Sequence, residues 1–143
     1  LMHAGTFNNN PFTMHAGYAA ITEVYTPERA IAINLAGDRL RERLQTLAAH
    51  HSVPIVFSGI GSLMCLHVAQ QAIRSPGDGI KTSEAEAAKF LLHLELLARG
   101  IYIAPRGMIV LSLPMTDREH DQLVAAFDDV FQSLAPNLAR LAR

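Results

Sequence analysis

The sequence predicts an α+β fold in which a small, mostly antiparallel sheet is covered by helices. Four stretches begin with a residue that caps helices and continue with apolar side chains at helical spacing. Two apolar stretches, 54–69 and 101–113, are interrupted by Gly or Pro, as is typical of strands joined by turns. Along the 143 residues the order is helix, helix, strands, helix, hairpin, helix, so one compact unit is expected.

The first helix is predicted by a proline that follows a capping side chain. Asn10 precedes Pro11, whose missing N–H costs nothing at the first position of a helix. The small and apolar residues that follow continue the helix to about Val24.

The second helix repeats this start signal with Thr26 and Pro27. We expect it to end near His50, because Pro54 favours extended backbone in the residue before it. Its apolar stripe consists of Ile33, Leu40, Leu44 and Leu47.

The two apolar stretches are expected to form the sheet. Gly59 and Gly61 interrupt the first, which predicts either two strands or one bent strand over 54–69. The second, 101–113, predicts a β-hairpin with its turn at 105–107.

The last two helices are predicted by capping boxes, in which a Ser or Thr is followed three residues later by Glu. Ser83 with Glu86 begins one helix, and Gly100 ends it. Thr116 with Glu119 begins the other. The third helix presents Phe90, Leu91, Leu94 and Leu97, and the fourth presents Leu123, Phe127, Phe131 and Leu134, with Pro136 expected to kink or end it.

Composition excludes several classes of function. The net charge is −1 and there is no basic run, which argues against nucleic-acid binding. No apolar stretch approaches the roughly 20 residues needed to cross a bilayer, and no signal-peptide pattern is present, so no membrane association is expected. The single cysteine, Cys65, favours a reducing compartment, and a cytoplasmic location is expected.

The sequence motifs give little support to a metal site or to hydrolase activity. The seven histidines stand at no recognisable ligand spacing, and Cys65 has no partner thiol. No G-x-S-x-G nucleophile motif occurs, and "GIGS" at 59–62 is too short for a dinucleotide-binding fingerprint. We therefore predict no metal site.

The opening loop, "AGTFNNNP", is a candidate phosphate site. Gly5 allows close backbone approach, Thr6 offers a hydroxyl beside its own N–H, and a helix begins five residues later. Backbone N–H groups with one hydroxyl form a small anion-binding cradle. The alternative is an ordinary Asn-rich loop that only caps a helix.

Arg106 is a candidate substrate-binding residue. It lies at the predicted turn between Pro105 and Gly107, where a guanidinium is able to hold a carboxylate through two parallel hydrogen bonds. The alternative is an exposed turn arginine without such a role.

At this point the motifs resemble a known family. "HAGTFNNNPFTMHAGYAAI" is similar to the H-G-G-T-F-x-x-N-P segment of class III pyridoxal-phosphate-dependent aminotransferases, the glutamate-1-semialdehyde 2,1-aminomutase group in particular. Three further matches follow in the family's order: "GSLMCLHV", "FLLHLELLARGIYIAP" and "LSLPMTDREHDQLVAAFDDVF". The resemblance covers essentially the whole chain.

This resemblance implies the C-terminal part of a fold-type I enzyme, an aminotransferase or aminomutase that uses pyridoxal 5'-phosphate with small-molecule amino donors and acceptors. It implies a cofactor-phosphate loop and connecting helix over 1–26 and a C-terminal small α+β domain over 27–143. In the family the Thr of the first motif contributes to the phosphate site of the partner subunit's cofactor. That role falls on Thr6 of a homodimer, with Gly5 giving backbone access.

The resemblance also implies that this chain is inactive alone. The family's Schiff-base lysine precedes the first motif, and neither Lys81 nor Lys89 lies in a similar context. Two departures concern the subtype: Ala4 replaces a glycine, and 106–112 is shorter than the loop of the aminomutases. The alternative from another class is a non-catalytic α+β interaction or oligomerisation module.

Overall fold

The computed structural model describes residues 5, 10–75 and 77–142, and the chain divides into two compact units, 1–32 and 33–143. The first unit holds α1 (Pro11–Ala19), which continues as a π-helical segment, η1 (Ala20–Val24). The helix α2 (Pro27–His50) follows, and most of its length belongs to the second unit. The starts and ends predicted for these helices are confirmed.

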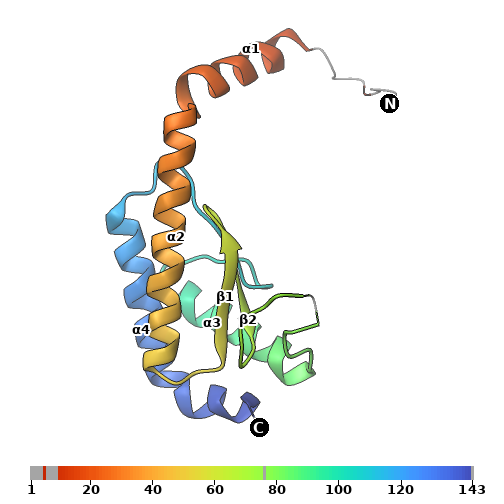
Figure 1. The fold of residues 1–143 in the computed structure, drawn as a ribbon, viewed down its shortest axis with the longest axis vertical. Helices are drawn as coiled ribbons and strands as arrows, with labels where there is room; N and C mark the ends of the chain where they lie inside the picture. The colour runs from red at the N-terminus through yellow and green to blue at the C-terminus, as the bar shows by residue number, and fades with distance from the viewer. Residues whose placement is uncertain (1–4, 6–9, 76, 143) are drawn as a thin grey trace. The chain divides into compact units, whose positions relative to one another are not determined.

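The second unit contains an antiparallel three-stranded sheet of order β1-β2-β3 (Figure 1). Its strands are β1 (Ile55–Ile60), β2 (Leu63–Val68) and β3 (Met108–Val110). Its further helices are α3 (Ser83–Ala98), α4 (Asp117–Leu138) and the 3₁₀ segment η2 (Ala139–Ala142). The predicted α+β class is confirmed, and 54–69 forms two strands.

The core lies between one face of the sheet and the helices. Ile55 and Phe57 from β1 alternate with less buried neighbours, as do Met64 and Leu66 from β2. Within this unit α2 and α4 lie side by side (Figure 1), joined by the ion pairs Arg43–Asp121 and His51–Asp128. The helix residues that complete the core include Leu40, Leu44, Leu92, Leu96, Leu123, Phe127, Val130 and Phe131.

The turn between β1 and β2 packs tightly against α2. The Asp38 carboxylate accepts a hydrogen bond from the Gly61 N–H at 3.0 Å, and the Asn34 side chain accepts one from the Ser62 N–H at 3.0 Å. A Cβ built on Gly37 would lie 2.1 Å from the Gly61 carbonyl oxygen, so only glycine fits there. This contact fixes the sheet against α2.

The hairpin predicted for 101–113 is wrong. Only β3 is a strand, and it pairs with β2. The turn at 105–107 does form, because the Gly107 N–H donates to the Ala104 carbonyl at 2.8 Å and the Ala104 N–H donates to the Met108 carbonyl. The Leu66 N–H donates to the Gly107 carbonyl at 2.8 Å, so beyond the turn the segment pairs with β2, and 101–104 forms no strand.

Two details of the helices also differ from prediction. The N-cap of α3 is Thr82, whose hydroxyl accepts from the Ala85 N–H, and Ser83 is already helical. The helix α4 runs through Pro136 to Leu138. The capping box of Thr116 and Glu119 is confirmed, with both of its hydrogen bonds present.

The apolar stripe predicted on α3 is not its buried face. Phe90, Leu91, Leu94 and Leu97 are all exposed, whereas Leu92, His93 and Leu96 face the core. Within the described part of the chain, no helix has the length and apolar character to cross a bilayer.

Candidate functional site

In the predicted phosphate loop, Gly5 is described and exposed, Asn10 and Pro11 are described at the start of α1, and Thr6 lies outside the described residues. The helix that follows does not offer free donors. Pro11 has no N–H, the Phe12 and Thr13 N–H groups donate to the Asn10 side chain at 3.0 and 3.3 Å, and the Met14 N–H donates to the Asn10 carbonyl. The first turn of α1 is therefore satisfied internally by Asn10.

The segment from α1 to η1 exposes apolar side chains. No residue of α1 or η1 is buried, and Phe12 is 86% exposed. Further large apolar residues exposed along it are Met14, Tyr18, Ile21 and Val24. A helix of this composition is usually covered by another surface.

Arg106 lies at an exposed turn held rigidly to the sheet. Gly107 has a φ of +93°, and a Cβ there would lie 2.5 Å from the Leu66 carbonyl oxygen, so the turn needs glycine at this position. The Arg106 guanidinium contacts the Met108 sulfur at 3.8 Å, and among the described residues no carboxylate pairs with it.

The two lysines of the chain have different surroundings. Lys89 is mostly buried and forms an ion pair with Glu86 at 2.6 Å. Lys81 is exposed in the loop before α3.

Polar groups missed by the sequence interpretation lie on the sheet face opposite the core. Ser58 Oγ and His67 Nε2 are 2.7 Å apart on β1 and β2. Burial, followed by the nearby Lys89 charge, lowers the pKa of His67. Burial raises the pKa of the half-buried Cys65 thiol, and the charges of Lys89 and Arg106 oppose that shift. The period-two alternation along β1 and β2 contained this signal, since these residues alternate with the core positions.

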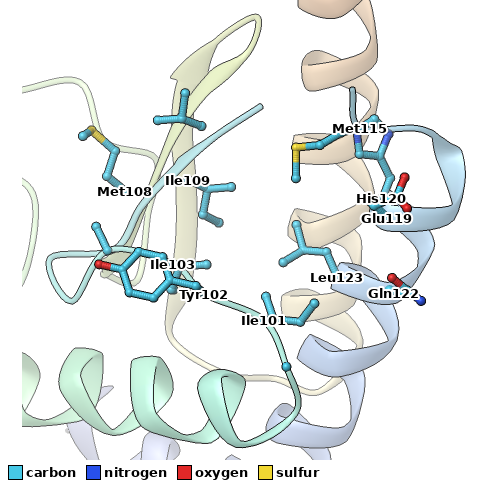
Figure 2. A pocket seen from close by; sticks show the side chains of 13 residues that line it. Ile101, Tyr102, Ile103, Met108, Ile109, Met115, Glu119, His120, Gln122 and Leu123 are labelled. Carbon is cyan, nitrogen blue, oxygen red and sulfur yellow. The ribbon is translucent and has the colours of Figure 1, made fainter. Parts of the chain in front are cut away.

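A second feature missed from the sequence is a cavity of about 420 Å³ between the 100–110 segment and α4. Figure 2 shows Met115 and Leu123 on one side of the opening and Ile103 and Ile109 on the other. His120 also lines it; this side chain is buried, and its Nε2 has no hydrogen-bond partner. The walls are mainly apolar, and no group of three potential metal ligands occurs among the described residues.

Comparisons with known proteins place these features in a family. No protein-family model matches the chain. A β-phenylalanine transaminase from Variovorax paradoxus is 48% identical over 126 residues, which is 88% of this chain and 29% of that protein. The chain is homologous to part of a class III pyridoxal-phosphate-dependent aminotransferase. A glutamate-1-semialdehyde 2,1-aminomutase of Listeria innocua is 28% identical over 130 residues, which is 90% of this chain and 30% of the aminomutase.

Solved aminotransferase structures share the fold. The β-phenylalanine aminotransferase of Variovorax paradoxus matches with a TM-score of 0.88 and 44% identity over 95% of this chain and 31% of its own. An ω-transaminase of Sphaerobacter thermophilus matches with a TM-score of 0.83 and 31% identity over 98% and 31%. A transaminase solved with pyridoxal phosphate bound matches with a TM-score of 0.76 and 26% identity over 96% and 31%. The chain thus spans about three tenths of the length of these aminotransferases, consistent with their C-terminal part.

Proposed function

We propose that this chain is the C-terminal part of a pyridoxal 5'-phosphate-dependent aminotransferase that transfers the amino group of a β-amino acid. The observation that carries the proposal is the 48% identity to a β-phenylalanine transaminase over 88% of the chain. The identities to aminomutases lie between 27% and 34%, so the transaminase subtype is favoured over the aminomutase one. The cofactor supplies an electron sink for the reaction when it is bound.

In this proposal Gly5 and Thr6 hold the phosphate of the cofactor that a partner subunit carries. Gly5 is exposed, which leaves its backbone accessible to a ligand. Because Asn10 satisfies the first turn of α1, the helix end does not compete for the anion. A hydroxyl and backbone N–H groups of the loop are the donor types that bind phosphate.

The same segment supports a homodimer. Phe12, Tyr18 and Ile21 are largely exposed along α1 and η1, and large exposed apolar side chains are typical of surfaces that another subunit covers. A loop delivered across such an interface reaches the partner's cofactor, which links dimerisation to activity.

Arg106 is proposed to bind the substrate carboxylate. Its guanidinium has no carboxylate partner among the described residues. Three backbone hydrogen bonds fix its turn: the Gly107 N–H donates to the Ala104 carbonyl, the Ala104 N–H to the Met108 carbonyl and the Leu66 N–H to the Gly107 carbonyl. A fixed planar guanidinium is suited to a carboxylate because it donates two parallel hydrogen bonds.

The chain by itself is expected to be inactive. The proposal places the Schiff-base lysine outside it, since Lys89 is paired with Glu86 and Lys81 lies in an exposed loop. An assay of the 143-residue chain with pyridoxal phosphate, an aromatic β-amino acid and a 2-oxo acid should detect no transamination; turnover would contradict this placement.

The phosphate role is tested in the longer protein that the proposal requires. Thr6→Val should weaken retention of pyridoxal phosphate by about tenfold or more, because a hydrogen bond to a charged group is lost. Thr6→Ser keeps the hydroxyl and serves as the matched control. Equal cofactor affinity in the Val and Ser variants would remove Thr6 from the site.

A further inference from the structure

We propose that the free edge of β3, the side that faces away from β2, is the docking site of a further strand. This strand belongs to a part of the longer polypeptide that lies outside residues 1–143, and its apolar side chains fill the cavity between the 100–110 segment and α4. The inference rests on the proposed function, because the longer aminotransferase polypeptide is the source of the strand.

The strand β3 lies at one end of the sheet, whose order is β1-β2-β3. The Gly107 carbonyl accepts a hydrogen bond from β2 at 2.8 Å, and the Leu111 N–H donates to the turn before β2 at 2.9 Å. In an antiparallel ladder the residues bonded to one neighbour alternate along the strand. The backbone groups of Ile109 therefore face β2, and those of Met108 and Val110 point to the free edge.

The free edge carries unused hydrogen-bonding groups. Among the described residues, the N–H groups of Met108 and Val110 have no acceptor and the Val110 carbonyl has no donor, whereas the Met108 carbonyl accepts from the Ala104 N–H at 3.1 Å. The sequence from 107 to 113, GMIVLSL, contains no charge and no proline. Proteins usually protect an edge strand with charged side chains, with proline or with a covering segment. An edge without these protections is suited to pairing with another strand.

The cavity beside the free edge is able to receive side chains of an added strand. The residues of β3 line it from one side, and Met115 and Leu123 line it from the other. Figure 2 shows Ile109 on the side of β3 that faces Met115 and Leu123. Residues directly opposite each other on neighbouring strands point to the same face of a sheet. An apolar residue of the added strand opposite Ile109 would therefore enter the cavity of about 420 Å³.

A polar atom in the wall of this cavity also lacks a partner. His120 is 7% exposed, and its Nε2 has no hydrogen-bond partner among the described residues. Its Nδ1 lies 3.8 Å from the Asp117 carboxylate, which is beyond hydrogen-bond distance. Because buried polar side chains are nearly always hydrogen-bonded, this atom indicates that a contact of the complete protein is missing here.

The short length of β3 favours a tethered segment over a separate molecule. Three residues offer few hydrogen bonds, and these do not offset the translational and rotational entropy that two molecules lose when they associate. A segment joined to the chain has a high effective concentration, so the same few bonds suffice. The chain spans 29% of the β-phenylalanine transaminase of Variovorax paradoxus, so a polypeptide of that length has ample residues outside 1–143 to supply a strand.

Amide hydrogen exchange tests this by comparing the 143-residue chain with the longer protein, using mass spectrometry with electron-transfer fragmentation to resolve single residues. The Met108 and Val110 amides should exchange at least about 100-fold more slowly in the longer protein, because both become hydrogen-bonded. The Ile109 amide already faces β2, so it is the internal control and should be protected in both. Equal exchange of the Met108 and Val110 amides in the two proteins would overturn the proposal. Protection that rises with the concentration of the 143-residue chain would also overturn it, since the edge would then belong to a second copy.

Two variants of Val110 separate the hydrogen bond from the side chain. Val110→Pro removes the N–H at the free edge, whereas Val110→Ala keeps it and is the matched control. In the longer protein the Met108 amide should lose at least about tenfold of its protection in Val110→Pro and retain it in Val110→Ala. Equal protection of Met108 in the two variants would refute the docking of a strand. If Val110→Pro does not fold, as judged by circular dichroism, the exchange comparison of the unsubstituted proteins decides.

The outcome is separable from that of the proposed function. Exchange at β3 is measured without reference to the cofactor, whereas the Thr6 variants are compared by their retention of pyridoxal phosphate. A longer protein that retains the cofactor but exchanges its Met108 and Val110 amides rapidly would contradict only the added strand. A longer protein that protects both amides but binds no pyridoxal phosphate would contradict only the proposed function.

Discussion

The helices α1 and α4 begin in the same way and end up in opposite environments. Asn10 caps α1 through its side chain, and Thr116 with Glu119 caps α4 through a full capping box. Yet α1 buries no residue, whereas α4 buries seven, among them Phe127 and Phe131, which are 0% exposed. The two helices therefore share a capping signal at their start and differ in how many of their residues are buried.

This difference separates two physical contributions. A cap satisfies backbone N–H groups and decides where a helix begins, but it contributes only about 1 kcal/mol. Burial of an amphipathic face supplies most of the stability of a helix within a protein. The caps of α1 and α4 should therefore stabilise the starts of their helices by similar free energies, while only α4 supports the fold of residues 33–143.

The largest expected effect comes from removing a core aromatic of α4. Phe127→Ala should lower the free energy of unfolding by about 3–5 kcal/mol, because Phe127 is fully buried and packs against Phe57 and Phe131. Phe12→Ala in α1 is the matched control and should change it by less than about 0.5 kcal/mol. Urea denaturation followed by far-UV circular dichroism compares the two; equal losses would mean that α1 is part of the same core.

A smaller effect is expected from adding a methyl group to a helical glycine. Gly37→Ala should destabilise the chain by about 1–3 kcal/mol, because the new Cβ would meet the Gly61 carbonyl at 2.1 Å. In α1, Gly17 has nothing within 4 Å, and Gly17→Ala should instead raise helix content, by about 0.5–1 kcal/mol of helix propensity. Thermal unfolding of both variants shows whether each substitution raises or lowers stability. An unchanged stability in Gly37→Ala would contradict the tight contact.

The caps themselves allow a direct comparison. Thr116→Ala should lower the free energy of unfolding by about 1 kcal/mol, because the N-terminal donors of α4 lose their acceptor. Asn10→Ala should reduce the helicity of residues 11–24 without moving the unfolding midpoint of the core. Amide hydrogen exchange resolves the two regions, and a midpoint shift in Asn10→Ala would show that α1 contributes to the core.

The smallest expected effect is a dependence of the folding stability on pH. Hydrogen bonds from Thr116, followed by Arg118, lower the pKa of Glu119 to about 2 from its usual 4.5. A carboxylate whose folded pKa is lowered contributes stability that is complete above about pH 4.5 and is lost as the pH falls toward 2. Glu119→Gln should flatten this part of the stability profile, measured by denaturation at several pH values. An unchanged profile would assign the acid sensitivity to other carboxylates.

The places where sequence interpretation failed are as informative as the places where it succeeded. The stretch 101–113 has strand-like composition throughout, but β3 found its hydrogen-bonding partner in β2, and 101–104 remained outside the sheet. The helix α3 is apolar on more than one side, so periodicity alone did not identify Leu92 and Leu96 as its core face. In both cases the residues of the segment predicted the type of secondary structure. The strand or helix face that the segment contacts was decided by residues far away in the chain.

The candidate site residues also fall into two groups, those identified from the sequence and those that only the structure revealed. Gly5, Thr6 and Arg106 were identified from the sequence, and their roles stay predictions. The Ser58–His67 pair and the cavity lined by His120 became apparent only in three dimensions. Sequence spacing within β1 and β2 indicated which residues share a face, but not that Arg106 approaches that face from a distant turn.

The sequence by itself determined where helices begin to within one residue, that 54–69 forms strands and which family the chain resembles, because caps, proline geometry, side-chain periodicity and motifs are local properties. Tertiary structure decided which face of α3 is buried, which strand β3 pairs with and which polar groups meet on the sheet face opposite the core. Those outcomes depend on contacts between residues far apart in the chain, where competing partners differ by only a few kcal/mol. The local sequence pattern does not show which of these partners is favoured, whereas the packed structure does.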